Sequence, residues 1–86
     1  MYSKSIVIQN KTGLHARPAN KFVNIAKDFK SHITIKKGEK TGDAKSMLNV
    51  LAMCISMGST VELTAEGADE QDAVETLIKY ISELVE

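Results

Sequence analysis

The chain has 86 residues, of which 43% are hydrophobic, and its eleven basic side chains balance eleven acidic ones. This length predicts one small domain over residues 1–86, with any chemistry at the surface rather than in an enclosed cleft. The balanced charge and the lack of a basic stripe argue against a nucleic-acid partner. No apolar run reaches membrane-spanning length and no signal-peptide pattern opens the chain, so we expect a cytoplasmic protein without membrane insertion.

The first part of the chain changes from strand to helix patterning and back. Residues 3–10 (SKSIVIQN) are β-branched and lead into a turn-like Asn-Lys-Thr-Gly, which predicts a strand. From Ala16 to about Phe29 the apolar residues recur at steps of three and four, which predicts an amphipathic helix. Residues 31–37 alternate, so we expect a strand with Ile33 and Ile35 on its inner face.

The second part repeats the pattern. We expect a short return strand over residues 40–44, a second helix over 45–57, and a strand over 59–67. A final helix is predicted because acidic residues suit its positive start and its apolar residues form one stripe. The inward strand residues are Val61, Leu63 and Ala65, and the helical stripe is Val74, Leu77, Ile78, Ile81, Leu84 and Val85.

The resulting order, β-α-β-β-α-β-α, indicates an α+β fold. Each predicted strand has one apolar and one polar face. This pattern is typical of an antiparallel sheet with one side in contact with solvent and the helices packed on the other.

The segment GLHARP at residues 13–18 reads as a junction between strand and helix. Gly13 permits a tight turn, Pro18 is tolerated in a first helical turn, and His15 falls at or next to the N-cap. Histidine is not a preferred cap, so stability alone does not explain it. A helix N-terminus binds anions, and Arg17 could place a guanidinium beside phosphate oxygens. This pattern predicts that His15 accepts a phosphoryl group.

Other interpretations of these residues remain open. A histidine near a helix start is often an ordinary surface residue, and His32 is most simply a solvent-facing strand residue. A metal site is not expected, because His32 is the only other histidine and Cys54 is a lone thiol. A single cysteine also cannot form an internal disulfide. A small nucleic-acid-binding domain is the alternative from another class, but four aromatic residues and a neutral charge count against it.

The second predicted helix has almost no polar face. If Val50, Met53 and Ile55 face the core, then Met47 and Leu48, together with Leu51, remain partly exposed and could form a partner site. The alternative is that the whole helix is buried. Ser46 precedes this helix and is well placed as its N-cap.

Three segments resemble the histidine-containing phosphocarrier family HPr of the bacterial sugar phosphotransferase system. GLHARPA (13–19) resembles the family's active-site signature, AKSMLNVLAM (44–53) its second phosphorylation region, and TAEGADEQDAV (64–74) its last strand and final helix. The resemblance implies an open-faced β-sandwich, with a four-stranded antiparallel sheet and three helices on one face. It also implies a carrier without a cofactor that is not a self-sufficient enzyme.

The resemblance further implies roles for single residues and for partners. His15 would be the phosphoryl acceptor, through Nδ1, and Arg17 would stabilise the phosphate. Enzyme I, itself charged by phosphoenolpyruvate, would supply the group, and IIA domains of sugar permeases would receive it. Contacts with these partners are expected at Asn20 and at the apolar residues Met47, Leu48 and Leu51, and the carrier is expected to be a monomer.

Two residues near the expected regulatory site depart from the family pattern. Ser46 matches a serine that a dedicated kinase, HPr kinase/phosphorylase, phosphorylates in many Gram-positive relatives. Family members often have glycine where this chain has Cys54 and, in Gram-positive bacteria, where it has Asn49. Cys54 leaves the end of the second helix open, and Asn49 weakens the expectation of docking to a catabolite-repression regulator. A regulatory paralogue with the same fold is the alternative function.

Overall fold

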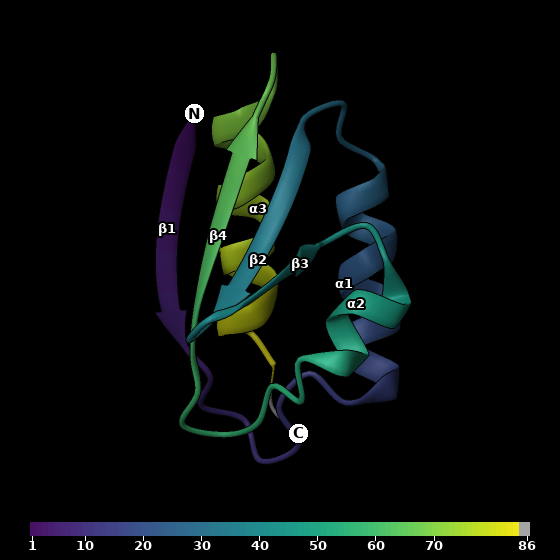
Figure 1. The fold of residues 1–86 in the computed structure, drawn as a ribbon, viewed down its shortest axis with the longest axis vertical. Helices are drawn as coiled ribbons and strands as arrows, with labels where there is room; N and C mark the ends of the chain where they lie inside the picture. The colour runs from purple at the N-terminus through teal and green to yellow at the C-terminus, as the bar shows by residue number, and fades with distance from the viewer. Residues whose placement is uncertain (85–86) are drawn as a thin grey trace.

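The computed structural model describes residues 1–84 and confirms the predicted order of elements. Four strands form one antiparallel sheet in the spatial order β1-β4-β2-β3 (Figure 1). The strands are β1 (Tyr2–Val7), β2 (His32–Lys37), β3 (Lys40–Asp43) and β4 (Thr60–Glu66), and the helices are α1 (Ala16–Lys27), α2 (Met47–Ala52) and α3 (Glu70–Ser82).

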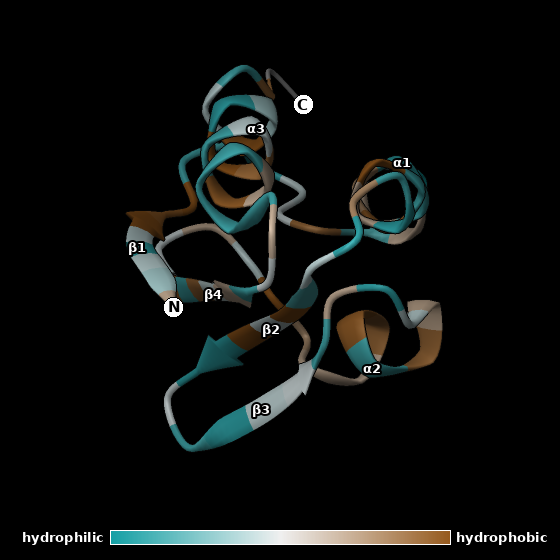
Figure 2. Ribbon diagram, turned by 90° about the horizontal axis from the view of Figure 1, so that it is seen from above, coloured by the Kyte–Doolittle hydropathy of each residue, from teal (hydrophilic) through white to brown (hydrophobic). Residues whose placement is uncertain are grey.

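The helices lie on one side of the sheet and leave its other face open, as the predicted open-faced sandwich requires (Figure 2). α3 packs on the three strands β1, β4 and β2, whereas α1 lies against α3 and α2, and α2 contacts β3. None of the helices in the described part of the chain has the length and hydrophobicity needed to cross a membrane.

The core lies between the inner face of the sheet and the apolar faces of α1 and α3. The predicted inward residues of the central strands are buried, as are three residues of the predicted stripe on the final helix, Val74, Leu77 and Ile81. Ile78 and Leu84 pack at the margin of this core. The last residue of the predicted stripe, Val85, lies outside the described residues. The buried set includes Ile33, Ile35, Val61, Leu63, Ala65, Phe22, Val23, Val74, Leu77 and Ile81.

The second helix is shorter than predicted. It ends at Ala52 instead of continuing to residue 57, because Cys54 adopts a positive φ of 51° that cannot continue a right-handed helix. The ammonium of Lys37 donates hydrogen bonds to the backbone oxygens of Met53 (3.1 Å) and Cys54 (2.9 Å) just past the helix end. A cation at this end also interacts favourably with the helix dipole.

The first strand is also shorter than predicted, because it ends at Val7 rather than at residue 10. Ile8 leaves the ladder but stays buried: its N–H donates to Ser59 O, and its carbonyl accepts from Gly58 N, both at 2.8 Å. The strand therefore gives way to a loop that is still bonded to the segment before β4.

Asp69 joins the start of α3 to the connection between α1 and β2. Its carboxylate accepts hydrogen bonds from the backbone N–H groups of Lys30 (2.8 Å) and Ser31 (2.9 Å) and from the Ser31 hydroxyl. These bonds, with the Ser31 hydroxyl contributing most, lower the pKa of Asp69 from its ordinary 3.8 to about 2.

We expect this contact to make stability depend on pH in the acid range. The folded pKa of Asp69 is depressed, so its contribution is complete well above pH 3.8 and disappears as the pH falls toward 2. Asp69→Asn should lower the urea midpoint at pH 6 and flatten its decline between pH 4 and 2. Asp72→Asn is the matched control, because Asp72 is an exposed carboxylate in the first turn of α3, which Asp69 caps. Equal midpoints for the two variants at pH 6 would contradict the assignment.

Candidate functional site

His15 is the N-cap of α1, as predicted. Its backbone is extended (φ −68°, ψ −178°), and its carbonyl accepts the first helical hydrogen bond from Ala19 N at 2.8 Å. The imidazole makes no capping hydrogen bond and is exposed. Pro18 has no N–H to leave unpaired in this turn. A nucleophilic side chain therefore stands at the positive end of a helix with its ring open to solvent.

The loop before His15 is held by the segment that follows α2. Gly13 has φ +60°, and a Cβ added there would lie 2.3 Å from the carbonyl oxygen of Ile55. The next residue, Leu14, is buried and donates its N–H to the same oxygen at 3.1 Å. Only glycine accommodates both the backbone conformation and this close approach.

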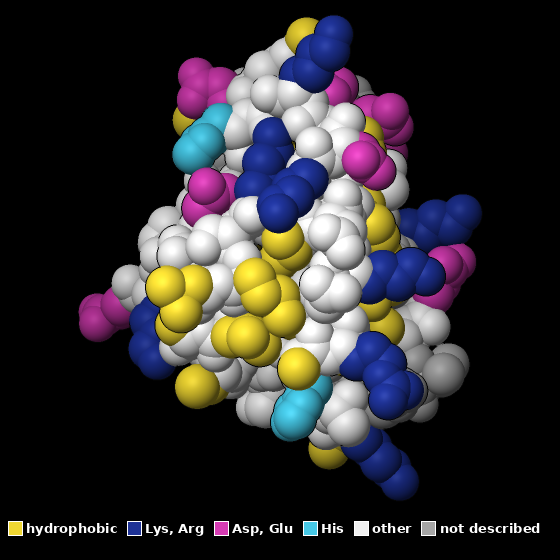
Figure 3. All heavy atoms as spheres, turned by 90° about the vertical axis from the view of Figure 1, so that its right-hand side faces the viewer, with side chains coloured by type: hydrophobic (Ala, Val, Ile, Leu, Met, Phe, Trp, Pro, Cys, Tyr) yellow, Lys and Arg dark blue, Asp and Glu magenta, His cyan; other side chains and the backbone are white. Residues whose placement is uncertain are grey.

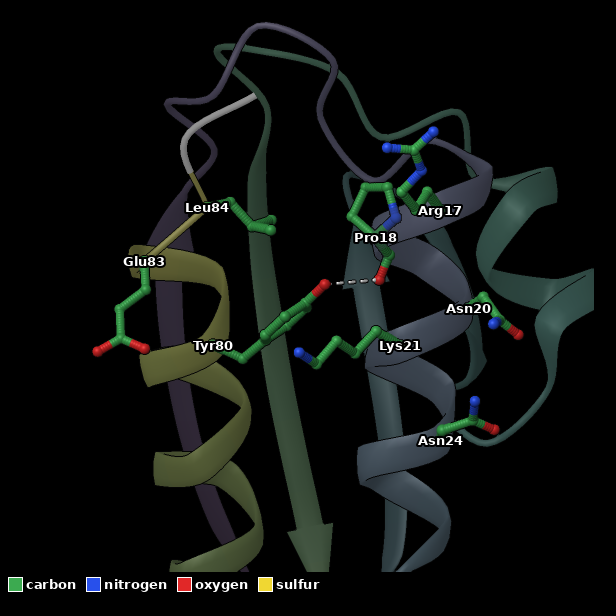
Figure 4. Close-up of a pocket in the computed structure, with 8 residues that line it drawn as sticks. All are labelled: Arg17, Pro18, Asn20, Lys21, Asn24, Tyr80, Glu83 and Leu84. Atoms are coloured by element: carbon green, nitrogen blue, oxygen red, sulfur yellow. Dashed lines mark hydrogen bonds between the residues drawn. The ribbon is translucent and has the colours of Figure 1, made fainter.

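Two contacts that sequence reasoning missed support the same loop. The carboxamide of Asn10 is buried and donates through Nδ2 to Gly13 O at 2.9 Å. On the other side, the Tyr80 hydroxyl donates to Pro18 O at 3.2 Å and links α3 to the first turn of α1 (Figure 4). Turn propensity predicts an asparagine before Gly13, but no local pattern indicates which distant carbonyl a tyrosine will reach.

The structure brings Arg17 to the same cavity as His15. This cavity has a volume of about 410 Å³ and is lined by Lys11, Thr12, His15, Arg17 and Pro18. Arg17 also borders a groove between α1 and α3, in which the Lys21 ammonium lies 5.9 Å from the centre of the Tyr80 ring (Figure 4). The predicted nucleophile and the predicted cation therefore share one open hollow.

The short helix α2 exposes the three predicted apolar residues to different degrees. Leu48 is 77% exposed, Leu51 is 40% exposed and Met47 is half-buried, whereas Val50 is buried as predicted. We call Met47, Leu48 and Leu51 the α2 patch. Hydrophobic side chains gather on the face of the molecule shown in Figure 3.

The α2 patch adjoins the histidine. Leu51 lines a cavity of about 380 Å³ together with His15, Leu14 and Cys54. Met57, which sequence reasoning did not select, adds another exposed apolar side chain in the loop that follows. Asn20, the predicted partner contact on α1, is exposed.

Ser46 is the N-cap of α2, as predicted. Its Oγ accepts a hydrogen bond from Asn49 N at 3.2 Å, and the Asn49 side chain accepts one from Asp43 N at 3.0 Å. Asn49 therefore ties α2 to the end of β3. His32 is exposed on β2, and across residues 1–84 no three His, Cys, Asp or Glu side chains are grouped to hold a metal ion.

Comparison with known proteins defines the class to which this fold and site belong. The family model described as "PTS HPr component phosphorylation site" matches residues 2–83. The phosphocarrier protein HPr of Haemophilus influenzae is 43% identical over 98% of this chain and 99% of its own length. A crystal structure of HPr from Thermoanaerobacter tengcongensis superposes with a TM-score of 0.92 at 44% identity, covering 95% of this chain and 92% of that one.

The chain belongs to the HPr family, the phosphocarrier proteins of the phosphotransferase system. Similarity within the family extends to its regulatory branch. The HPr-like protein Crh of Bacillus subtilis is 40% identical over 99% of this chain and all of its own length. The family is therefore established, and the choice between carrier and regulator has to be argued from the site.

The close approach at Gly13 leads to a stability prediction. Gly13→Ala should destabilise the protein by about 2–5 kcal/mol, because the left-handed conformation costs roughly 1–2 kcal/mol and the overlap with Ile55 O adds about 1–3 kcal/mol. Gly38→Ala is the matched control: Gly38 has nearly the same φ, +61°, but nothing within 4 Å of an added Cβ. Urea melts of both variants separate the cost of the left-handed backbone from the cost of the overlap with Ile55. Equal losses of unfolding free energy would show that the contact with Ile55 is unimportant.

Proposed function

We propose that this protein is the phosphocarrier of a phosphoenolpyruvate-dependent sugar phosphotransferase system. It receives a phosphoryl group on His15 from enzyme I and passes it to IIA domains of sugar permeases. The observation that carries the proposal is the exposed His15 ring at the N-terminus of α1, beside a cavity that also contains Arg17. We propose further that residues 1–86 act as one cytoplasmic, monomeric domain with no cofactor and no catalysis of its own.

Each transfer is a direct displacement at phosphorus. A lone pair on the imidazole, at Nδ1 by analogy with the family, attacks the phosphoryl group on the donor protein. The bond between phosphorus and the donor atom breaks, and the donor atom keeps the electron pair. The other ring nitrogen keeps its proton during the attack, and that proton then equilibrates with solvent. In the transfer to a IIA domain the roles reverse: a nucleophile of that domain attacks phosphorus, and the bond to the imidazole nitrogen breaks with its electron pair returning to the ring. Arg17 offsets negative charge on the moving group, and the helix dipole acts in the same direction.

The α2 patch supports the idea of docking to partner proteins. Its apolar side chains stand beside a small charged site, where a partner can cover them while it approaches His15. We propose that enzyme I and the IIA domains both use this surface together with Asn20. Phosphorylation of Ser46 by a dedicated kinase would place about two negative charges at the edge of the patch and weaken that docking.

A regulatory role like that of Crh is the second candidate, because Crh proteins are among the close relatives. A regulator that acts only through protein contacts does not need a nucleophile, so an exposed His15 favours the carrier. Among solved relatives, an HPr from Thermoanaerobacter tengcongensis and Crh from Bacillus subtilis are described as dimers. Light scattering at several concentrations tests the proposed monomer.

Labelling of His15 decides the main proposal. Incubation with enzyme I and labelled phosphoenolpyruvate should give the wild type one acid-labile, base-stable phosphate, and His15→Ala should take up none. His32→Ala removes the other histidine, which is exposed on β2, and should label normally. Full labelling of His15→Ala would end the proposal, and an unlabelled wild type would favour the regulatory role.

The docking surface has its own test. Leu48→Glu should raise the KM for enzyme I about five- to thirtyfold, the effect expected at a binding hot spot, while the urea midpoint changes little because Leu48 is 77% exposed. Val7→Glu makes the same chemical change at an exposed site on β1, at the opposite edge of the sheet from the strand that α2 contacts. An unchanged KM for Leu48→Glu, or equal changes in both variants, would contradict the docking role.

A further inference from the structure

The cavity beside His15 has two cationic side chains on its wall. Arg17 is one, and the other is Lys11, which neither the sequence pattern nor the resemblance singled out. Lys11 comes from the loop before the helix, whereas Arg17 comes from the helix itself. The two cations therefore reach the same hollow from different segments of the chain.

The backbone at Lys11 is held in place by its neighbours. Gly13 N donates to Asn10 O at 3.2 Å, which closes a tight turn with Lys11 and Thr12 at its two corners. Asn10 is only 6% exposed, and its side chain donates back to Gly13 O at 2.9 Å. A buried amide that bonds across its own turn restricts where the corner side chains can project.

The Lys11 side chain is available for a ligand. It is exposed, and within residues 1–84 it forms no ion pair, since the salt bridges there join the Met1 amine to Glu70 and Lys4 to Glu75. An ammonium on a flexible four-carbon stem suits a charge that arrives and leaves, because it is a point charge that needs no fixed fork geometry.

We propose that Lys11 is a second phosphate-binding side chain, which contacts the phosphoryl oxygens once His15 is phosphorylated. The proposal rests on the proposed function of His15. Phosphorylation adds a group with nearly two negative charges to the ring, in a cavity that already contains this ammonium. The contact stabilises the phosphorylated carrier and so shifts the transfer equilibrium away from the phosphorylated donor protein. An exposed charge pair of this kind changes an equilibrium by about two- to fivefold.

Chemical phosphorylation tests the contact without any partner protein. Phosphoramidate transfers its phosphoryl group to imidazole nitrogen and releases ammonia, and a His32→Gln background confines the product to His15. The phosphorus NMR titration of that product should move to higher pH by about 0.3–0.7 unit in Lys11→Ala, which corresponds to the two- to fivefold effect. Lys11→Arg should titrate close to the wild type, and 0.5 M salt should reduce the difference between Lys11→Ala and the wild type.

Lys40→Ala is the matched control, because it removes one charge from an exposed residue of β3 that lines no part of the His15 cavity. It should titrate like the wild type. Equal midpoints for Lys11→Ala and the wild type would overturn the proposal, and so would an equal shift in Lys40→Ala, which would indicate net charge alone.

The equilibrium of phosphoryl exchange with enzyme I is a second measurement of the Lys11 contact. Phosphoryl exchange between enzyme I and the carrier should favour enzyme I about two- to fivefold more with Lys11→Ala than with the wild type. If enzyme I fails to label the wild type while the chemical titration still depends on Lys11, the proposed function fails and the phosphate contact remains. If enzyme I labels all variants to the same equilibrium and the titrations coincide, the Lys11 proposal alone fails.

Discussion

The contact between Gly13 and the Ile55 carbonyl determines how the two halves of the site lie. A side chain at residue 13 would overlap that oxygen, and the same oxygen accepts the Leu14 N–H. The loop before His15 and the loop after α2 are therefore fixed at one shared atom. Because Leu51 lies just before the second loop, the position of His15 and that of its apolar neighbour follow from one close approach.

This arrangement suits chemistry that two proteins must share. The hollows around His15 are shallow and are lined by the protein's own loop and helix residues. A partner can approach the ring directly, and in doing so it covers the site and excludes water. A deep cleft would hinder transfer between macromolecules, so the small size of the chain and the exposed ring support the carrier role proposed above.

Local patterns in the sequence predicted much of this architecture because the relevant physics is local. The alternation in β2 and β4, the period of α1 and α3, and the N-caps at His15 and Ser46 depend on neighbouring residues. The end of α2, which the sequence left open at Cys54, falls earlier than the range 45–57 because it depends on the backbone at Cys54 and on a lysine from a distant strand.

Most of the contacts that escaped prediction join segments far apart in the sequence; the bond from Asn10 to Gly13 is the local exception. Asp69 accepts a hydrogen bond from Ser31, which is 38 residues away in the sequence, and Tyr80 donates one to Pro18, which is 62 residues away. Lys11 was missed for another reason: in the sequence it is one more exposed lysine, and only the cavity reveals that it stands beside His15. Periodicity carries no information on such pairs, because the partners are set by how the elements pack.

The strand order has a consequence for how the chain folds as it is synthesised. β4 pairs with both β1 and β2, so the first strand has no sheet partner until residues 60–66 are available. A nascent chain that has emerged only through α2 can form helical turns and the β2–β3 hairpin, but its first strand keeps unpaired backbone groups. Completion of the sheet must therefore wait until β4 has left the ribosome, late in translation.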